Sequence, residues 1–256
     1  MPGPLSPVTI SLLEKVATDN GFDRELVREG DWLVFASTQC PLHVWLGAGA
    51  DTTFLAALSQ RNVARELRQH GAATTVPLPA EALEALEIAG IPDLHRFLRR
   101  AFQLSKTLPH ELLHEFERKA AALPNTTEAE RLVVQRVGQD VFRQGLLEFW
   151  DERCAVTGLA VAEILRASHI KPWAHCVSDA ERLDVYNGLL LAPNLDAVFD
   201  GGLITVLDDG PVVMSDRLND QARRLLGLDD SLRVRSLADG HRAYLGWHRA
   251  HVFHAK

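Results

Sequence analysis

The sequence Ala-Ser-His-Ile-Lys-Pro-Trp at residues 167–173 is followed by Asn-Gly-Leu-Leu-Leu at residues 187–191, and then by Asp196 and Asp200. A histidine closes one apolar segment and an asparagine opens the next. A Pro-Asn-Leu-Asp turn then leads into a short helical pattern, on which the two aspartates lie four positions apart and share one face. The pattern predicts two strands and a helix that bring an imidazole, an amide and two carboxylates together.

This layout, from roughly residue 143 to residue 253, resembles HNH endonucleases, a family of ββα-metal nucleases, in the branch that reads Ser-His-Ile-Lys-Pro-Trp at its first motif. The resemblance implies an α+β protein with a C-terminal HNH domain that hydrolyses phosphodiester bonds in DNA. By the same resemblance, His169 is the general base that activates water, and Asn187 holds it in position. The metal ligand on the family's helix falls at Asp196, and Asp200 lies one turn further on.

Two positions depart from the family's pattern. Ser168 stands where many HNH enzymes carry an acidic residue or a second histidine, and Asp196 replaces the histidine of the helix. Carboxylates suit hard ions, so the expected cofactor is Mg²⁺ or Mn²⁺, held by Asp196, Asp200, water and substrate phosphate. Cys154 stands alone where a zinc knuckle would have a Cys-x-x-Cys pair, so no structural zinc is expected. Because this ligand set is thin, the alternative is a catalytically weak or inactive HNH-fold module that binds DNA or protein.

Several residues near the motif have two interpretations. Lys171 contacts a substrate phosphate or is an ordinary solvated lysine. Asp200 is a metal ligand or caps the end of its helix. Trp173 is expected to pack in the core rather than against a base. Five histidines have mixed spacing and are expected on helix surfaces rather than in a metal cluster: His175, His241, His248, His251 and His254.

The charge balance limits how the chain binds nucleic acid. Of 256 residues, 27 are Lys or Arg and 34 are Asp or Glu, for a net charge of −7. Residues 1–130 carry −5 of this charge and the remainder carries −2, so general attraction to phosphates is weak in the first half. A divalent ion bound by the two carboxylates would cancel negative charge locally. DNA remains the expected partner, because the field at the binding face decides binding.

Other features bear on location and assembly. The three cysteines are scattered and odd in number, which implies no disulfide framework and favours a reducing cytoplasm. No apolar run is long enough for a bilayer, so no membrane association is expected. One HNH site cuts one strand at a time, so double-strand cleavage needs a homodimer or two encounters. An HNH domain joined to another module suggests restriction or defence, with the first half choosing the target.

Periodicity and turn signals predict two domains, at residues 1–123 and 127–256. Thr127 and Glu130 form a capping-box pattern at the start of the second domain. The first domain is an unassigned α+β domain and a candidate target-recognition module. Its predicted helices cover residues 9–20, 52–70, 80–89 and 92–104, with a further helix that ends near residue 123, and its predicted strands cover 32–36 and 43–46. In the second domain a hairpin is predicted at 203–214 and a terminal helix at 242–253.

Aromatic and basic residues of the first domain also have two interpretations. Trp32, Phe35 and Trp45 occur at strand spacing and are expected in the core rather than in a base-binding cage. Arg61, Arg65 and Arg68 share one face of a predicted helix, and a solvated face is the expectation for them.

Overall fold

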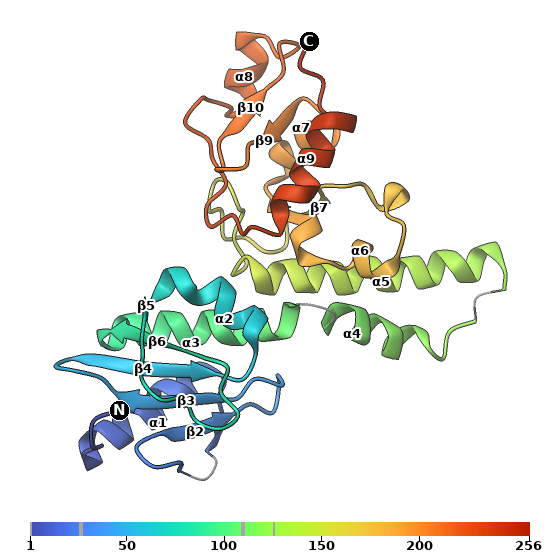
Figure 1. The fold of residues 1–256 in the computed structure, drawn as a ribbon. Coiled ribbons are helices and arrows are strands. Elements are labelled where there is room, and N and C mark those ends of the chain that lie inside the picture. The colour runs from blue at the N-terminus through green and yellow to red at the C-terminus, as the bar shows by residue number, and fades with distance from the viewer. Residues whose placement is uncertain (1, 26–27, 109–110, 125) are drawn as a thin grey trace. The chain divides into compact units, whose positions relative to one another are not determined.

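The computed structural model describes residues 2–25, 28–108, 111–124 and 126–256 (Figure 1). The chain divides into two compact units, Met1–Leu108 and Pro109–Lys256. Both units contain helices and strands, so the predicted α+β class is confirmed. Within the described ranges, none of the helices is both long enough and apolar enough to span a bilayer.

The N-terminal unit is built on a six-stranded antiparallel sheet in the order β1-β2-β3-β4-β6-β5. The strands are β1 (Arg24–Glu25), β2 (Leu33–Ala36), β3 (Val44–Ala48), β4 (Thr53–Leu58), β5 (Ala72–Ala73) and β6 (Glu84–Ala89). The helices are α1 (Pro7–Asp19), α2 (Arg61–Leu67), the short 3₁₀ helix η1 (Arg68–His70) and α3 (Gly90–Thr107). The predicted strands at residues 32–36 and 43–46 are confirmed as β2 and β3.

The predicted helix at residues 80–89 is wrong, and the one at 52–70 is wrong in its first part, whereas residues 61–70 are helical as α2 and η1. The segment Thr53–Leu58, expected to begin a helix, is β4, and the segment Glu84–Ala89, expected to end one, is β6. The two strands pair along their whole length, from Thr53 opposite Ala89 to Leu58 opposite Glu84. Both segments are rich in alanine and leucine, which favour helices, but the backbone hydrogen bonds of a central sheet position outweigh that weak preference.

The aromatic residues of the N-terminal unit form core, as expected. Trp32, Phe35 and Trp45 are 5%, 2% and 1% exposed. The indoles of Trp32 and Trp45 share a cluster with Leu55, and none of the three aromatic side chains is available at the surface for a base. The arginines also follow the expectation: Arg61, Arg65 and Arg68 are all exposed, and Arg68 in addition pairs with Glu84 at 2.7 Å.

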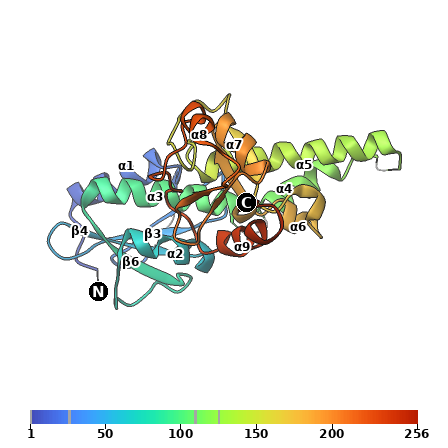
Figure 2. The ribbon, with the colours of Figure 1, turned by 90° about the horizontal axis from the view of Figure 1, so that it is seen from above.

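The C-terminal unit begins with α4 (Glu111–Ala120) and α5 (Glu128–Phe149), which lie side by side (Figures 1 and 2). A Cβ on Gly145 of α5 would lie 2.3 Å from Leu112 of α4, so the glycine makes room for that leucine. This packing makes α4 part of the second unit, and the division at Leu108 falls earlier than the predicted one between residues 123 and 127. The capping box of Thr127 and Glu130 at the start of α5 is confirmed.

The rest of the C-terminal unit carries the motif. An antiparallel pair of strands, β7 (Arg166–His169) and β8 (Gly188–Leu191), is followed directly by helix α7 (Pro193–Asp200). The loop between the two strands contains η2 (Trp173–His175), α6 (Asp179–Arg182) and η3 (Val185–Asn187). The predicted hairpin is confirmed as β9 (Ile204–Val206) and β10 (Val212–Met214), which precede α8 (Asp220–Leu226), and the predicted terminal helix is confirmed as α9 (His241–His251).

Helix α5 packs directly on the β7–β8 pair at Gly188. A Cβ at this position would lie 2.6 Å from both Leu146 Cδ1 and Phe142 Cζ of α5. Phe142 and Leu146 are 1% and 0% exposed, so they are part of the core of the unit. The glycine therefore sets how closely the helix approaches the strands.

Two histidines of α9 correct an expectation from the sequence. His241 and His248 are 0% and 1% exposed, so the prediction that they lie on a helix surface is wrong. His248 stacks on Phe199 of α7, with ring centroids 4.1 Å apart, and its Nε2 lies 3.3 Å from the Phe199 carbonyl oxygen. Its Nδ1 lies 3.0 Å from the Thr205 hydroxyl of β9. Burial lowers the pKa of His248 to about 4, so a neutral imidazole joins α9 to α7 and β9.

Replacing Gly188 should test the approach of α5 to the strands. Gly188→Ala should lower the free energy of unfolding by about 1–3 kcal/mol, because the added methyl overpacks the core. The backbone there is extended, at φ −143°, so the contact alone causes the cost. Urea unfolding measures the change, and Gly246→Ala is the control. A Cβ at Gly246 would have Arg249 as its nearest neighbour, at 3.7 Å, so the free energy of unfolding of Gly246→Ala should equal or exceed that of the wild type. An unchanged midpoint for Gly188→Ala would contradict the close packing.

The buried His248 should make the protein less stable in acid. Its folded pKa of about 4 lies below the ordinary value of 6.5, so the unfolded chain takes up the proton first. The free energy of unfolding should therefore be highest above about pH 6.5 and should fall towards pH 4, by at most roughly 3 kcal/mol from this group. Urea unfolding at the two ends of this range should show a smaller loss for His248→Gln than for the wild type. His251→Gln, on the exposed side of the same helix, should keep the full loss, and an undiminished loss in His248→Gln would exclude His248 as its source.

Candidate active site

The predicted residues lie on β7, β8 and α7, and β7 packs against both of the other elements. His169 ends β7 and pairs with Gly188 at the start of β8, and Asn187 immediately precedes that glycine. Ser168, the neighbour of His169, is 2% exposed and donates its hydroxyl hydrogen bond to Asp196 in the first turn of α7. The hydrogen bond joins the end of the first strand to the helix, so the imidazole and the carboxylate belong to adjacent elements.

The His169 imidazole is held as a neutral ring. Its Nε2 lies 2.9 Å from the backbone carbonyl oxygen of Arg182 in α6. A carbonyl oxygen only accepts, so the geometry assigns the proton to Nε2 and leaves a lone pair on Nδ1. Burial lowers the pKa of His169 from 6.5 to about 4, against a smaller opposing effect of the Arg182 carbonyl. A histidine that is unprotonated near neutral pH can accept a proton from water.

Asn187 contacts the backbone of the loop rather than the imidazole. Its Oδ1 accepts a hydrogen bond of 2.8 Å from the Lys171 N–H, and its Nδ2 lies 3.2 Å from the carbonyl oxygens of Lys171 and Glu181. The side chain is fully buried. Lys171 lies two residues after His169, and Glu181 precedes the residue whose carbonyl binds the ring. The amide thus ties the backbone just after His169 to α6, whose Arg182 carbonyl oxygen binds the imidazole.

Burial and the charge of Asp196 both act on the Asp200 carboxyl group of α7. The pKa of Asp200 is raised from 3.8 to about 6, first by desolvation and second by the negative charge of Asp196. The C-cap of α7 is Gly201, whose N–H bonds to backbone carbonyls, so the capping interpretation of Asp200 gains no support. Repulsion between two neighbouring carboxylates is relieved by a divalent cation, and their oxygens are the ligands that Mg²⁺ and Mn²⁺ prefer. The donor set therefore fits such an ion.

The protein supplies only part of a metal shell. Among the residues that the structure describes, no group of three or more His, Cys, Asp or Glu side chains could hold an ion. The histidines of α9 thus form no such group within those residues. Asp196 and Asp200 would need water and substrate oxygens to complete the coordination of a magnesium-like ion, which keeps several waters in most protein sites.

Lys171 has a protein partner in the loop between the two strands. Its Nζ lies 2.6 Å from Glu181 Oε1, and the two side chains are 13% and 20% exposed. The ammonium also lies 5.8 Å from the ring centre of Trp247. An ion pair with so little exposure holds the loop between β7 and β8, so Lys171 is not a solvated lysine, and its contact with a substrate phosphate stays a prediction.

Several residues that contact His169 and Asn187 were not predicted from the sequence. Phe142 of α5 stacks on His169, and Trp173 meets the same ring nearly at right angles. Trp173 is thus packed against the imidazole, in keeping with its expected role in packing. Arg182 and Glu181, in the loop, provide the carbonyls that bind His169 and Asn187. Phe142 sits in an ordinary amphipathic helix, so its spacing carried no sign of a contact with the motif.

The cysteine of the motif region serves packing. The Cys154 sulfur accepts hydrogen bonds from the backbone N–H groups of Thr157 and Ala192, at 3.4 and 3.3 Å. Ala192 lies between β8 and α7, so this sulfur ties the turn before the first strand to the point where the helix begins.

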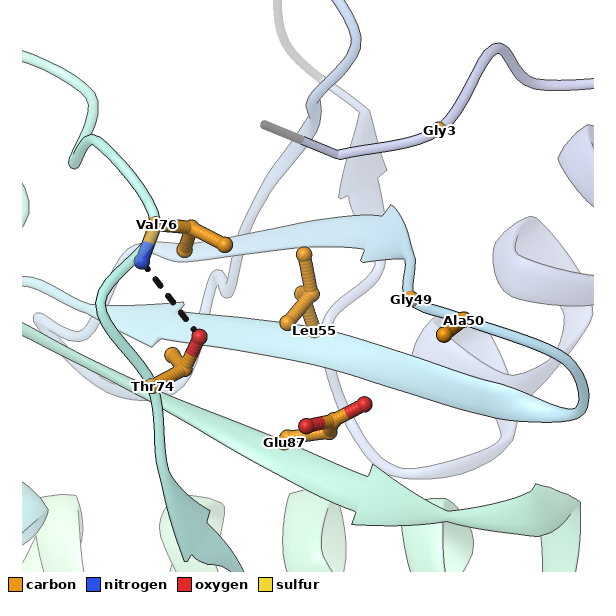
Figure 3. A pocket seen from close by; sticks show the side chains of 7 residues that line it. All are labelled: Gly3, Gly49, Ala50, Leu55, Thr74, Val76 and Glu87. Carbon is orange, nitrogen blue, oxygen red and sulfur yellow. Dashed lines mark hydrogen bonds between the residues drawn. The ribbon is translucent and has the colours of Figure 1, made fainter.

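A separate cavity of about 330 Å³ lies in the N-terminal unit (Figure 3). Its one charged lining residue is Glu87, whose carboxylate accepts a hydrogen bond of 2.6 Å from Thr53. The lining residues are Gly3, Gly49, Ala50, Leu55, Thr74, Val76 and Glu87. None of them is a predicted site residue, so the cavity and the His169 neighbourhood are distinct features of the chain.

Comparison with known proteins identifies the C-terminal motif. Residues 154–207 match the family model of the HNH endonucleases, and no curated protein matches the chain. The matched segment contains β7, β8 and α7, and with them His169, Asn187, Asp196 and Asp200. The geometry of this segment is the two-strand and one-helix arrangement that the resemblance implied. The C-terminal half of this chain therefore contains a domain of the HNH endonuclease family.

Proposed function

We propose that this protein is a DNA endonuclease that hydrolyses phosphodiester bonds with the help of Mg²⁺ or Mn²⁺. The observation that carries the proposal is the arrangement of β7, β8 and α7, in which Ser168, next to the buried His169, donates its hydroxyl hydrogen bond to Asp196 on the adjoining helix. Phosphodiester hydrolysis needs a water made nucleophilic and a counter-charge for the phosphorane and the leaving oxygen. The imidazole meets the first need and the two carboxylates can hold an ion for the second.

Each residue has a defined part in this proposal. Nδ1 of His169 takes the proton from the attacking water while Nε2 keeps its hydrogen bond to the Arg182 carbonyl. Asn187 acts as a positioning residue, because it binds the loop backbone on both sides of that contact. Asp196, fixed by the Ser168 hydroxyl, and Asp200 would hold the metal. A divalent ion bound there supplies the positive charge that the phosphorane and the departing oxygen require.

The wider setting is also a proposal. Restriction or defence in the cytoplasm suits an HNH domain joined to a separate unit, and the three unpaired cysteines suit a reducing compartment. The unit Met1–Leu108 would choose the DNA target, and a homodimer would allow both strands to be cut. General phosphate attraction contributes little to this choice, because the first half of the chain is acidic.

A second candidate function has its own support. Ser168 replaces an acidic residue and donates to Asp196, Lys171 is occupied by Glu181, and the described residues offer no group of three ligands. These features would also suit an HNH fold that binds DNA or protein without cutting. Incubation of supercoiled plasmid with the protein in Mg²⁺ or Mn²⁺ separates the two candidates, because only the nuclease produces nicked circles.

If His169 is the base, His169→Ala should remove nicking almost completely. Loss of general-base catalysis usually costs about 10²–10⁴ in rate. Asn187→Ala should lose less, because the amide transfers no proton. Plasmid nicking at saturating metal gives the rates, while circular dichroism and a DNA gel-shift assay control for fold and binding. Near-native turnover in His169→Ala would remove this residue from the mechanism.

If the α7 carboxylates hold the ion, Asp196→Asn should raise the metal concentration needed for half-maximal nicking and weaken the calorimetric binding of Mn²⁺. Asp200→Asn should do the same if it is a ligand, because each substitution removes one anionic oxygen donor. The control is Asp209→Asn, an exposed carboxylate in the β9–β10 turn. Unchanged Mn²⁺ affinity in both α7 variants would place the metal elsewhere.

A further inference from the structure

The face of the His169 imidazole lies on an aromatic ring from a helix outside the motif. The ring centroids of Phe142 and His169 are 3.8 Å apart, and the ring planes differ by 17°. Trp173 meets the imidazole at 5.4 Å and 87°. Phe142 belongs to α5 and lies twelve residues before the segment that matches the HNH family. The motif therefore does not contain all the residues that surround its histidine.

Glycines near the contact leave the space in which Phe142 and Trp173 can lie against the His169 ring. Gly188 pairs with His169 across the strands, and a Cβ there would lie 2.6 Å from the Phe142 ring. Gly138, one turn earlier on α5, leaves room for Trp173, whose Cη2 would lie 2.8 Å from an added Cβ. Phe142 thus covers the backbone of Gly188 and extends over the neighbouring imidazole.

A second residue of α5 holds the strand that ends in His169. The Arg143 guanidinium donates hydrogen bonds of 2.6 and 2.8 Å to the carbonyl oxygens of Leu165 and Ala162. Leu165 immediately precedes β7 and Ala162 lies four residues before the strand, so α5 holds both the segment that leads into the strand and the ring at its end.

We propose that Phe142 is a positioning residue for the general base, which holds the His169 imidazole in one plane and one tautomer. The inference rests on the proposed role of His169. Stacking fixes the plane of the ring, and the Arg182 carbonyl fixes its rotation within that plane. Together these contacts leave Nδ1 as the only ring nitrogen that can take a proton. The π face of Phe142 also attracts the positive charge that the imidazole gains on taking it.

A purely structural role for Phe142 makes a different prediction, and Leu146 offers the matched control. Leu146 lies one turn further along α5 and packs on the same Gly188, where an added Cβ would lie 2.6 Å from its Cδ1. Its aliphatic side chain cannot stack on the imidazole. Removing either side chain disturbs the packing of α5 on the strands, but only the loss of Phe142 frees the imidazole ring.

The experiment compares the full-length wild type with Phe142→Leu, Phe142→Met and Leu146→Ala. Volume-conserving apolar exchanges usually leave a fold intact, so two replacements without an aromatic ring are tested. Nitrogen-15 spectra of histidine-labelled protein report the tautomer, and the His169 signal is identified by its loss in His169→Gln. Steady-state nicking gives kcat and KM for plasmid, and thermal unfolding gives the loss of stability.

In the wild type, His169 should show a protonated Nε2 and an unprotonated Nδ1. Both Phe142 variants should show a mixture of tautomers and a kcat lower by about 10- to 100-fold, with KM for DNA unchanged, because misplacing a catalytic group has effects of this size. Leu146→Ala should lose stability while keeping the wild-type tautomer and most of its kcat.

The proposal is overturned if both Phe142 variants keep the single tautomer and the wild-type kcat, or if Leu146→Ala loses as much turnover as they do. A wild-type protein that nicks no plasmid in Mg²⁺ or Mn²⁺ would instead reject the proposed nuclease function. The nitrogen-15 comparison would still decide whether Phe142 fixes the ring.

Discussion

The contact between α5 and Gly188 is the constraint on which the C-terminal unit depends. Because this residue has no side chain, Phe142 and Leu146 fill the space above the strand pair and close the core from that side. The same contact places an aromatic ring over His169. Packing and chemistry therefore meet at Phe142, which fills the space above Gly188 and also stacks on the imidazole, whereas Leu146 contributes to the packing alone.

Burial acts in opposite ways on the two kinds of titratable group at the site. It lowers the pKa of His169 and raises that of Asp200, because in both cases the charged form is disfavoured. The outcome is a neutral imidazole at the end of β7 and, on α7, an Asp200 carboxyl group that holds its proton more tightly than usual. A divalent cation would relieve the second effect without protonating the first group. Ser168 contributes by binding one oxygen of Asp196, which limits the directions in which that carboxylate can present its remaining lone pairs.

The sequence was a better guide to the C-terminal unit than to the N-terminal one. The β9–β10 hairpin, the terminal helix and the start of α5 were predictable, because the residues that specify them are neighbours in the sequence. In the N-terminal unit, the sequence predicts helices where the structure has β4 and β6. Their alanine and leucine content favours a helix in isolation, and only the pairing of Thr53–Leu58 with Glu84–Ala89 turns both into strands. Such pairing joins residues about 30 positions apart, and no short window of sequence contains it.

The sequence by itself determined the motif: a histidine at the end of one strand, an asparagine before the next, and two aspartates on one face of the following helix. Spacing sufficed because these residues occupy consecutive elements whose geometry is regular. The tertiary structure alone decided what surrounds them. In the folded protein Phe142 stacks on His169, and Lys171 forms an ion pair with Glu181. The side chain of Asn187 is hydrogen-bonded to the loop backbone, and His241 and His248 are buried. These contacts depend on how elements far apart in the chain pack against one another, and side-chain periodicity reports which face of an element is buried but not which residue it meets there.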